Sequence, residues 1–123
     1  MMTKPSPIVV ITGATNGIGL ATKKLMQTKG VVTIVCDREN NDEPNYLFLD
    51  LMNSESIAEC VRSIPDGIDA LINCAGVAPI NHPNEAVLQV NWLGTKSLTE
   101  QVLPKIKPTG SVTTVASRAG AYQ

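Results

Sequence analysis

The segment PIVVITGATNGIG, residues 7 to 19, decides the fold of this 123-residue chain. Its apolar part, Ile8 to Ile11, is β-branched and shows no alternation with polar residues. That pattern is typical of a strand buried on both faces of a parallel sheet. Three glycines follow at once, and a helical pattern begins among them. The segment therefore predicts a strand, a tight turn and a helix.

The three glycines of the turn predict an anion site. A glycine-rich turn from strand to helix leaves the first N–H groups of the helix unpaired, with the positive end of the helix dipole behind them. Gly13 would allow the sharp turn, Gly17 a close approach of a pyrophosphate, and Gly19 close packing of helix on strand. The spacing G-x-x-x-G-x-G is neither the common G-x-G-x-x-G nor a P-loop, so a simple tight turn stays an alternative.

The helix after the turn is expected to bury one apolar stripe and to end at Gly30. Lys23 and Lys24 are expected to point away from that stripe. The residues of the stripe are Ile18, Ala21 and Leu25.

A carboxylate at the end of the next strand makes the anion site more specific. Residues 31 to 36 read as a second buried strand, and Asp37 follows it, 18 residues beyond Gly19. In a βαβ unit this position lies beside the ribose of a bound dinucleotide. An ordinary acidic residue at a strand end is the alternative.

Composition narrows the class of protein. The net charge is −1, and no basic run or aromatic-and-basic stripe suggests a nucleic-acid partner. The N-terminal apolar run is too short for a secretory signal or a membrane span. Three cysteines without metal-ligand spacing are expected to be buried, reduced thiols of a cytoplasmic protein, and no metal site is predicted.

The rest of the chain continues the strand and helix alternation. Residues 46 to 50 read as a third strand, and the eight residues before them leave no room for a full crossover helix. Asn53 or Ser54 is expected to cap a helix that buries Ile57, Val61 and Ile64. Residues 69 to 73 form the fourth strand of this prediction.

A long helix and a fifth strand complete the predicted order. Asn84 is expected to cap the helix, and a buried Asn91 within it would need a polar partner or a functional role. Trp92 is expected to pack in the core or between subunits, whereas the single histidine, His82, is not expected to be catalytic. Residues 111 to 116 form the fifth strand, which delivers Ser117 to its carboxyl end. The predicted fold is α/β, a Rossmann-like doubly wound parallel sheet truncated after the fifth strand.

Two of these stretches resemble signatures of the short-chain dehydrogenase/reductase family. Residues 12 to 19, TGATNGIG, resemble its TGxxxGIG motif. Residues 73 to 76 resemble its NNAG motif, with Cys74 in place of the second asparagine.

Three further matches follow in the family's order. Asp50 and Leu51 match the pair along the adenine, Asn91 matches the active-site asparagine, and Ser117 matches the catalytic serine. The shortened second crossover resembles the 3α-hydroxysteroid dehydrogenase/carbonyl reductase branch, which suggests a steroid or xenobiotic carbonyl as substrate.

The resemblance implies an NAD(P)-dependent oxidoreductase that transfers hydride between nicotinamide and a carbonyl or secondary alcohol. Asp37 favours NAD, because its carboxylate accepts from the ribose 2′-hydroxyl and repels a 2′-phosphate, while Arg38 would favour NADP. Ser117 and Asn91 are the implied catalytic residues. The implied cofactor-binding residues are Gly13, Thr15, Asn16, Gly17, Ile18, Gly19, Asp37, Arg38, Asp50, Leu51, Asn73, Ala75 and Gly76.

The family's Tyr-x-x-x-Lys pair is absent, since Tyr122 comes five residues after Ser117 and no lysine follows it. Residues 1 to 123 are therefore expected to be one dinucleotide-binding domain, incomplete at its C-terminal end and inactive on its own. A non-catalytic dinucleotide-binding module and an inactive fragment are the alternatives. An unpaired fifth strand would favour a homo-oligomer.

Overall fold

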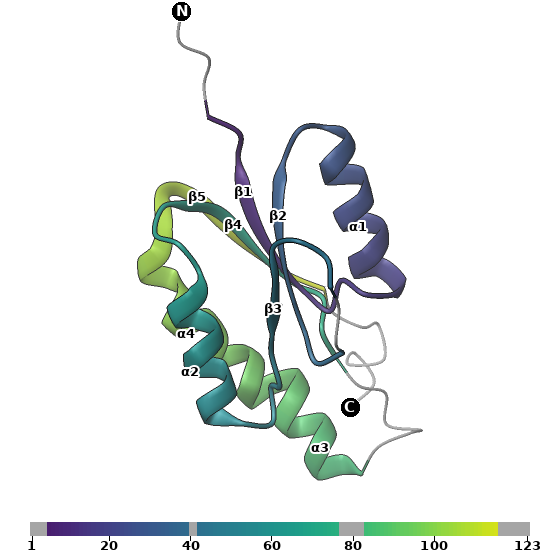
Figure 1. Cartoon of the computed structure of the whole chain (residues 1–123). Helices are drawn as coiled ribbons and strands as arrows, with labels where there is room; N and C mark the ends of the chain where they lie inside the picture. The colour runs from purple at the N-terminus through teal and green to yellow at the C-terminus, as the bar shows by residue number, and fades with distance from the viewer. Residues whose placement is uncertain (1–4, 40–41, 77–82, 116–123) are drawn as a thin grey trace, which may run out of the picture.

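A computed structural model describes residues 5–39, 42–76 and 83–115 of the chain. Its five strands form one parallel sheet in the order β3-β2-β1-β4-β5. Helices cover both faces of the sheet (Figure 1). The strands are β1 (Ile8–Thr12), β2 (Val32–Asp37), β3 (Tyr46–Phe48), β4 (Ile68–Asn73) and β5 (Ile106–Thr114). The predicted α/β Rossmann-like sheet is confirmed.

The central strand is buried as the sequence predicts. Val10 and Ile11 are fully buried on opposite faces, because successive side chains of a strand alternate in direction and both faces carry a helix. Strand order reverses at β1, since the chain moves from β1 to β2 and β3 on one side and to β4 and β5 on the other. Ligands of open α/β sheets bind at the carboxyl ends of the strands at such a point.

The helices divide unequally between the two faces. α1 (Gly17–Thr28) contacts β1 and β2 on one face, while α2 (Ser54–Ser63) and α4 (Thr95–Val102) pack together on the other. Short helical segments flank α4. They are α3 (Asn84–Leu88), the π-helical η2 (Gln89–Gly94) and the single 3-10 turn η3 (Leu103–Lys105).

Several local predictions are confirmed. The Asn53 side chain caps α2 by accepting from the N–H groups of Glu55 and Ser56, and the predicted stripe of α2 is buried. Gly30 follows the end of α1 with a φ of +77°. Between β2 and β3, residues 38–39 and 42–45 contain no helix, as the short spacing requires.

The predicted buried stripe of α1 is wrong. Ile18 and Leu25 are 65% and 59% exposed and Ala21 is exposed as well, whereas Lys23 is buried and only Lys24 points away as predicted. The Lys23 Nζ reaches Glu43 at 2.5 Å, so a carboxylate from the segment between β2 and β3 compensates the buried charge. Sequence periodicity alone assumes that polar residues face water, and a counter-ion from another element overrides that assumption.

The long helix also differs from its prediction. It begins at Asn84 with Pro83 as the N-cap, and a π-helical turn interrupts it at residues 89–94. Trp92 is 58% exposed, so it does not pack in the core of this chain.

The fifth strand begins earlier than predicted, at Ile106 instead of residue 111. Its pairing with β4 shifts register between Ile68 and Ala70, and this irregularity accommodates Pro108 and Gly110 at the edge of the sheet. Within the described residues, no helix is long and apolar enough to cross a membrane.

Candidate functional site

The turn after β1 is built by two glycines that cannot be replaced without a clash. Gly13 has a φ of +68°, and a Cβ placed on it would lie 2.7 Å from the Cα of Ala75. A Cβ on Gly19 would lie 2.2 Å from the carbonyl oxygen of Gly13. These two residues therefore let β1, the turn, α1 and the end of β4 pack together, as predicted for the first and third glycines.

Gly17 differs from both, because a Cβ placed on it would meet no atom within 4 Å. Its φ is +57°, so the backbone needs glycine here, yet the space above it is open. The side chain of Asn16, the N-cap of α1, makes no capping hydrogen bond, and the first turn of α1 has no acidic residue. The first turn of α1 therefore carries no carboxylate of its own, and its first N–H groups are available to an anion.

Asp37 lies at the carboxyl end of β2, next to this turn. Its Oδ2 accepts from the Thr15 hydroxyl at 2.8 Å and from the Thr15 N–H at 3.3 Å. Its Oδ1 accepts from the N–H of Arg38 at 2.7 Å and of Glu39 at 3.3 Å. Four donors therefore fix the carboxylate, and they hold it beside the start of α1.

Tyr46 supports the same strand end from β3, since its hydroxyl donates to the Asp37 carbonyl oxygen at 2.7 Å. Burial, and then the negative charge of Asp37, raise the pKa of Tyr46 above 10.0. The hydroxyl therefore stays a donor at neutral pH, and the end of β2 is held from both sides.

The ends of β1 and β4 are joined by Thr12. Its Oγ1 accepts from the N–H groups of Cys74 and Ala75, both at 3.1 Å. Beyond them, a Cβ on Gly76 would lie 3.1 Å from the Oδ1 of Asn91. The absence of a side chain at Gly76 thus leaves room for Asn91, which comes from η2.

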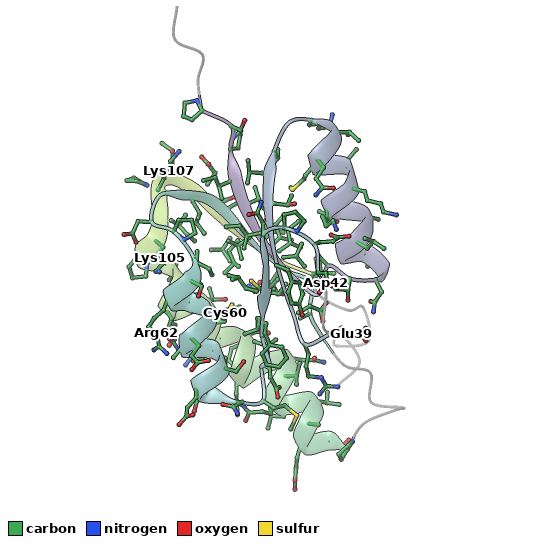
Figure 2. All side chains as sticks on the ribbon, in the orientation of Figure 1. Glu39, Asp42, Cys60, Arg62, Lys105 and Lys107 are labelled. Carbon is green, nitrogen blue, oxygen red and sulfur yellow. The ribbon has the colours of Figure 1, made fainter. Side chains whose placement is uncertain are left out.

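These strand ends surround one pocket of about 200 Å³. Its exposed lining residues Asn16, Arg38 and Glu39 are polar. Its floor is formed by buried apolar residues, Cys36, Leu49, Leu51 and Val90, and this combination suits a flat heteroaromatic ring joined to a sugar. The lining residues are Gly13, Asn16, Cys36, Asp37, Arg38, Glu39, Leu49, Asp50, Leu51, Cys74, Ala75, Gly76 and Val90. Figure 2 shows Glu39 at this end of the sheet and Lys107 at the opposite end.

The pocket brings together many, but not all, of the residues that the sequence singled out. Gly13, Asn16, Asp37 and Arg38 line it, and so do Asp50, Leu51, Ala75 and Gly76. Thr15, Gly17, Ile18 and Gly19 lie in the adjoining turn and the start of α1.

Asn73 faces the interior instead. Its Nδ2 donates to the Oγ1 of Thr99 at 3.1 Å and of Thr114 at 3.4 Å. Its Oδ1 is buried without a hydrogen-bond partner among the residues that the structure describes. The side chain therefore ties β4 to α4 and β5 and does not line the pocket.

Asn91 is exposed, which corrects the expectation of a buried side chain. It stands in η2, where the hydrogen-bond pattern widens to that of a π-helix, and π-helical turns occur often at functional sites. Gly94 explains part of this local geometry, because a Cβ on it would lie 2.3 Å from the Leu51 carbonyl oxygen. Ser117, His82 and Tyr122 lie outside the described residues.

Sequence reasoning missed five residues of the pocket wall, namely Cys36, Glu39, Leu49, Cys74 and Val90. All five neighbour a predicted site residue in the sequence, so adjacency to Asp37, Arg38, Asp50, Asn73 and Asn91 was the available signal.

The thiols of the wall are uncharged at neutral pH. The Sγ atoms of Cys36 and Cys60 lie 3.5 Å apart, and this contact and burial hold the pKa of Cys36 well above 9.0. Burial also raises the pKa of Cys74. All three cysteines are free, and Cys60 lies on α2 facing the sheet (Figure 2).

Comparison with known proteins agrees with this geometry. The family model for short chain dehydrogenases matches residues 7–123. The chain is 38% identical over 115 residues to a coniferyl-alcohol dehydrogenase of a Pseudomonas species, covering 92% of this chain and 45% of that protein. It is 31% identical over 100 residues to the 3-alpha-hydroxysteroid dehydrogenase/carbonyl reductase of Comamonas testosteroni, covering 81% and 39%.

A solved structure gives the same result for the fold. The 3-alpha-hydroxysteroid dehydrogenase of another Pseudomonas strain, crystallised with NADH, superposes with a TM-score of 0.78 at 26% identity. The alignment covers 93% of this chain and 49% of that one. The chain thus spans about half the length of these relatives or less.

Proposed function

Because this chain belongs to the short-chain dehydrogenase family, we propose that its pocket binds NAD and that the protein serves hydride transfer between nicotinamide and a carbonyl compound or secondary alcohol. One observation carries this proposal. The open glycine turn at the start of α1 and the carboxylate of Asp37 lie at the same pocket. When bound, the nicotinamide supplies a hydride donor or acceptor.

The residues present fit a dinucleotide. The open space at Gly17 and the uncapped start of α1 suit a pyrophosphate, which Gly13, Asn16, Gly17, Ile18 and Gly19 would surround. The apolar floor with Leu51 suits an adenine ring, and Asp50 would lie at its edge.

The remaining proposed roles concern the sugars and the nicotinamide half. Asp37 would accept from the adenosine ribose, with Thr15 and Arg38 beside it. Ala75 and Gly76 would border the nicotinamide half with their backbone, and Asn73 would hold the end of β4 in place.

We propose NAD over NADP because two carboxylates, those of Asp37 and Glu39, line the wall where a 2′-phosphate would lie. Arg38 lines the same wall and opposes this preference. Titration with both dinucleotides tests the choice, and an affinity for NADP at least about tenfold higher than for NAD would overturn it.

For the substrate we propose a small-molecule carbonyl or alcohol, with a steroid or xenobiotic as one class. The likeness to a 3-alpha-hydroxysteroid dehydrogenase/carbonyl reductase and to a coniferyl-alcohol dehydrogenase supports this class. Ser117 would donate a hydrogen bond to the substrate oxygen as charge develops on it. Asn91 would hold a water in a proton relay, consistent with its exposed position at Gly76.

The second candidate is a dinucleotide-binding module without catalysis. Residues 1–123 contain no Tyr-x-x-x-Lys pair, since Tyr46 is followed four residues later by Asp50. We therefore propose that the 123 residues alone bind the cofactor but turn over ketones negligibly. Turnover at rates typical of enzymes would contradict the proposed inactivity. If the 123 residues bound no dinucleotide, they would be an inert fragment.

We also propose self-association. Among the described residues, β5 lies at one edge of the sheet and is mostly exposed, and a strand in such a position can pair with a second copy of the chain. A clean monomer in light scattering would contradict it. The three free thiols are consistent with a reducing compartment such as the cytoplasm.

One substitution tests the pyrophosphate site without threatening the fold. Ile18 is exposed in the first turn of α1. A carboxylate at this position would stabilise the helix by interacting with its dipole, but it would repel an anionic ligand. We expect Ile18→Glu to keep or raise the melting temperature and to weaken NAD binding at least about tenfold by calorimetry. Ile18→Gln is the neutral control. Equal affinities of the two variants would refute the proposed site.

A further inference from the structure

The carboxylate of Asp37 is held by hydrogen bonds at both of its oxygens. Its Oδ1 accepts from two backbone N–H groups that follow it directly in the chain, those of Arg38 and Glu39. Its Oδ2 accepts twice from Thr15. A carboxylate offers about four lone-pair sites, and only two of these donors, the Thr15 hydroxyl and the Arg38 N–H, lie closer than 3.3 Å, so capacity remains to accept from a ribose hydroxyl.

Among the described residues, the hydrogen bonds from Thr15 are those that join the carboxylate of Asp37 to another element. Thr15 lies in the turn between β1 and α1, 22 residues away in the chain. Its hydroxyl makes the shortest hydrogen bond to Oδ2, at 2.8 Å, and a hydrogen bond to a charged acceptor is about twice as strong as a neutral one. Thr15 is not among the residues that line the pocket, whereas Asp37 is.

The charges on the pocket wall make the orientation of Asp37 decisive. Arg38 and Glu39 line the same wall. With Asp37 fixed, a 2′-phosphate would meet two carboxylates and one guanidinium. With Asp37 released to turn toward solvent, the guanidinium and one carboxylate would remain, and the repulsion would fall.

We propose that Thr15 is a positioning residue that locks Asp37 toward the pocket and so sets the discrimination between NAD and NADP. This inference rests on the proposed function, because it concerns the selectivity of the same pocket. It assigns the role to the hydroxyl, since the N–H of residue 15 is present with any side chain.

The experiment compares the whole chain with three variants, Thr15→Val, Thr15→Ser and Thr22→Val. Valine keeps the shape of threonine and removes the hydroxyl, and serine restores it. Thr22→Val is the matched control, because the Thr22 hydroxyl donates within α1 to the Ile18 carbonyl oxygen. Calorimetry gives the dissociation constants for NAD and NADP, and amide hydrogen exchange reports on residues 38 and 39 in the absence of ligand.

We expect Thr15→Val to lower the ratio of the NADP to the NAD dissociation constant about tenfold, by weakening NAD, tightening NADP, or both. The amides of residues 38 and 39 should exchange about threefold faster or more. Thr15→Ser and Thr22→Val should keep the wild-type ratio. General damage to the fold would weaken both dinucleotides alike and leave the ratio unchanged.

Three outcomes would overturn the inference. Unchanged exchange in Thr15→Val would show that the hydroxyl does not hold Asp37. Faster exchange with an unchanged ratio would refute the effect on selectivity, while NAD binding by the wild type would still support the proposed function. A wild-type chain that binds neither dinucleotide would refute the proposed function itself, and the selectivity role with it.

Discussion

The two faces of the sheet differ in how they are packed. The face under α2 and α4 carries a cluster of 14 buried residues, whereas the face under α1 carries a cluster of four. On the second face, polar ties supplement the apolar contacts, namely the Lys23–Glu43 ion pair and the hydrogen bond from Gln27 to Thr33.

The pocket lies where these two faces meet. Much of the floor of the pocket is formed by residues of the large cluster, namely Cys36, Leu49, Leu51 and Val90. Gly13 and Asn16 come from the α1 side. The firmly packed half under α2 and α4 thus provides the floor of the pocket. The lightly packed half under α1 provides the turn that would meet an anion. Stability and ligand affinity should therefore respond to substitutions in different halves.

The largest expected effect comes from truncating a side chain of the large cluster. Leu98 of α4 is fully buried, so Leu98→Ala should lower the free energy of unfolding by about 2–5 kcal/mol. Leu25→Ala on α1 removes the same atoms from an exposed site and should cost no more than about 0.5 kcal/mol. Urea unfolding followed by circular dichroism measures both, and equal losses would show that the faces are equally packed.

A smaller effect is expected where η2 meets the loop after β3. A Cβ on Gly94 would lie 2.3 Å from the Leu51 carbonyl oxygen, so Gly94→Ala should destabilise by about 1–3 kcal/mol. Without that contact, alanine in a helix would stabilise by about 0.5–1 kcal/mol. The sign of the change in the free energy of unfolding, measured with urea, thus shows whether the contact between residue 94 and the Leu51 carbonyl oxygen is rigid. Glu100→Ala, on the exposed side of α4, serves as the control.

The ion pair on the α1 face gives the third prediction. Lys23 is 8% exposed and Glu43 55% exposed, so Glu43→Gln leaves a buried ammonium without its full counter-charge. Because Glu43 is partly in water, the expected loss is about 1 kcal/mol. Glu59→Gln removes an exposed carboxylate that pairs with Arg62 at 4.0 Å and should change the melting temperature hardly at all. Similar losses in both variants would contradict a special role for Lys23.

The smallest effect concerns the end of the sheet opposite the pocket and depends on pH. The N–H of Ile8, and then Lys107, hold the pKa of Asp69 below its usual 3.8. A lowered pKa adds stability above pH 3.8 that is lost as the pH falls through the folded-state pKa. Asp69→Asn should therefore be less stable than wild type at pH 7.

The difference in unfolding free energy between wild type and Asp69→Asn should shrink only below pH 3.8. Asp66→Asn, at an exposed position nearby in the chain, is the control. A difference that stays constant down to pH 2 would show that the charge of Asp69 contributes nothing.

Much of the fold followed from local patterns. The β-branched run at residues 8–11, the caps of α2 and the short connection before β3 were each predictable, because burial on both faces, capping and chain length are properties of a few neighbouring residues. The exposed Asn91 and the buried Lys23 were not, because each depends on an element distant in the chain.

For this protein, the sequence by itself determined the order of strands and helices, the glycine turn, and a carboxylate 18 residues beyond it, since glycine conformation and strand length act locally. Only the tertiary structure decided which face was packed firmly, which side chains lined the pocket, and which donors held Asp37. Those outcomes depend on side chains that meet across the sheet, and the hydroxyl of Thr15 reaches Asp37 only because β1 and β2 lie side by side.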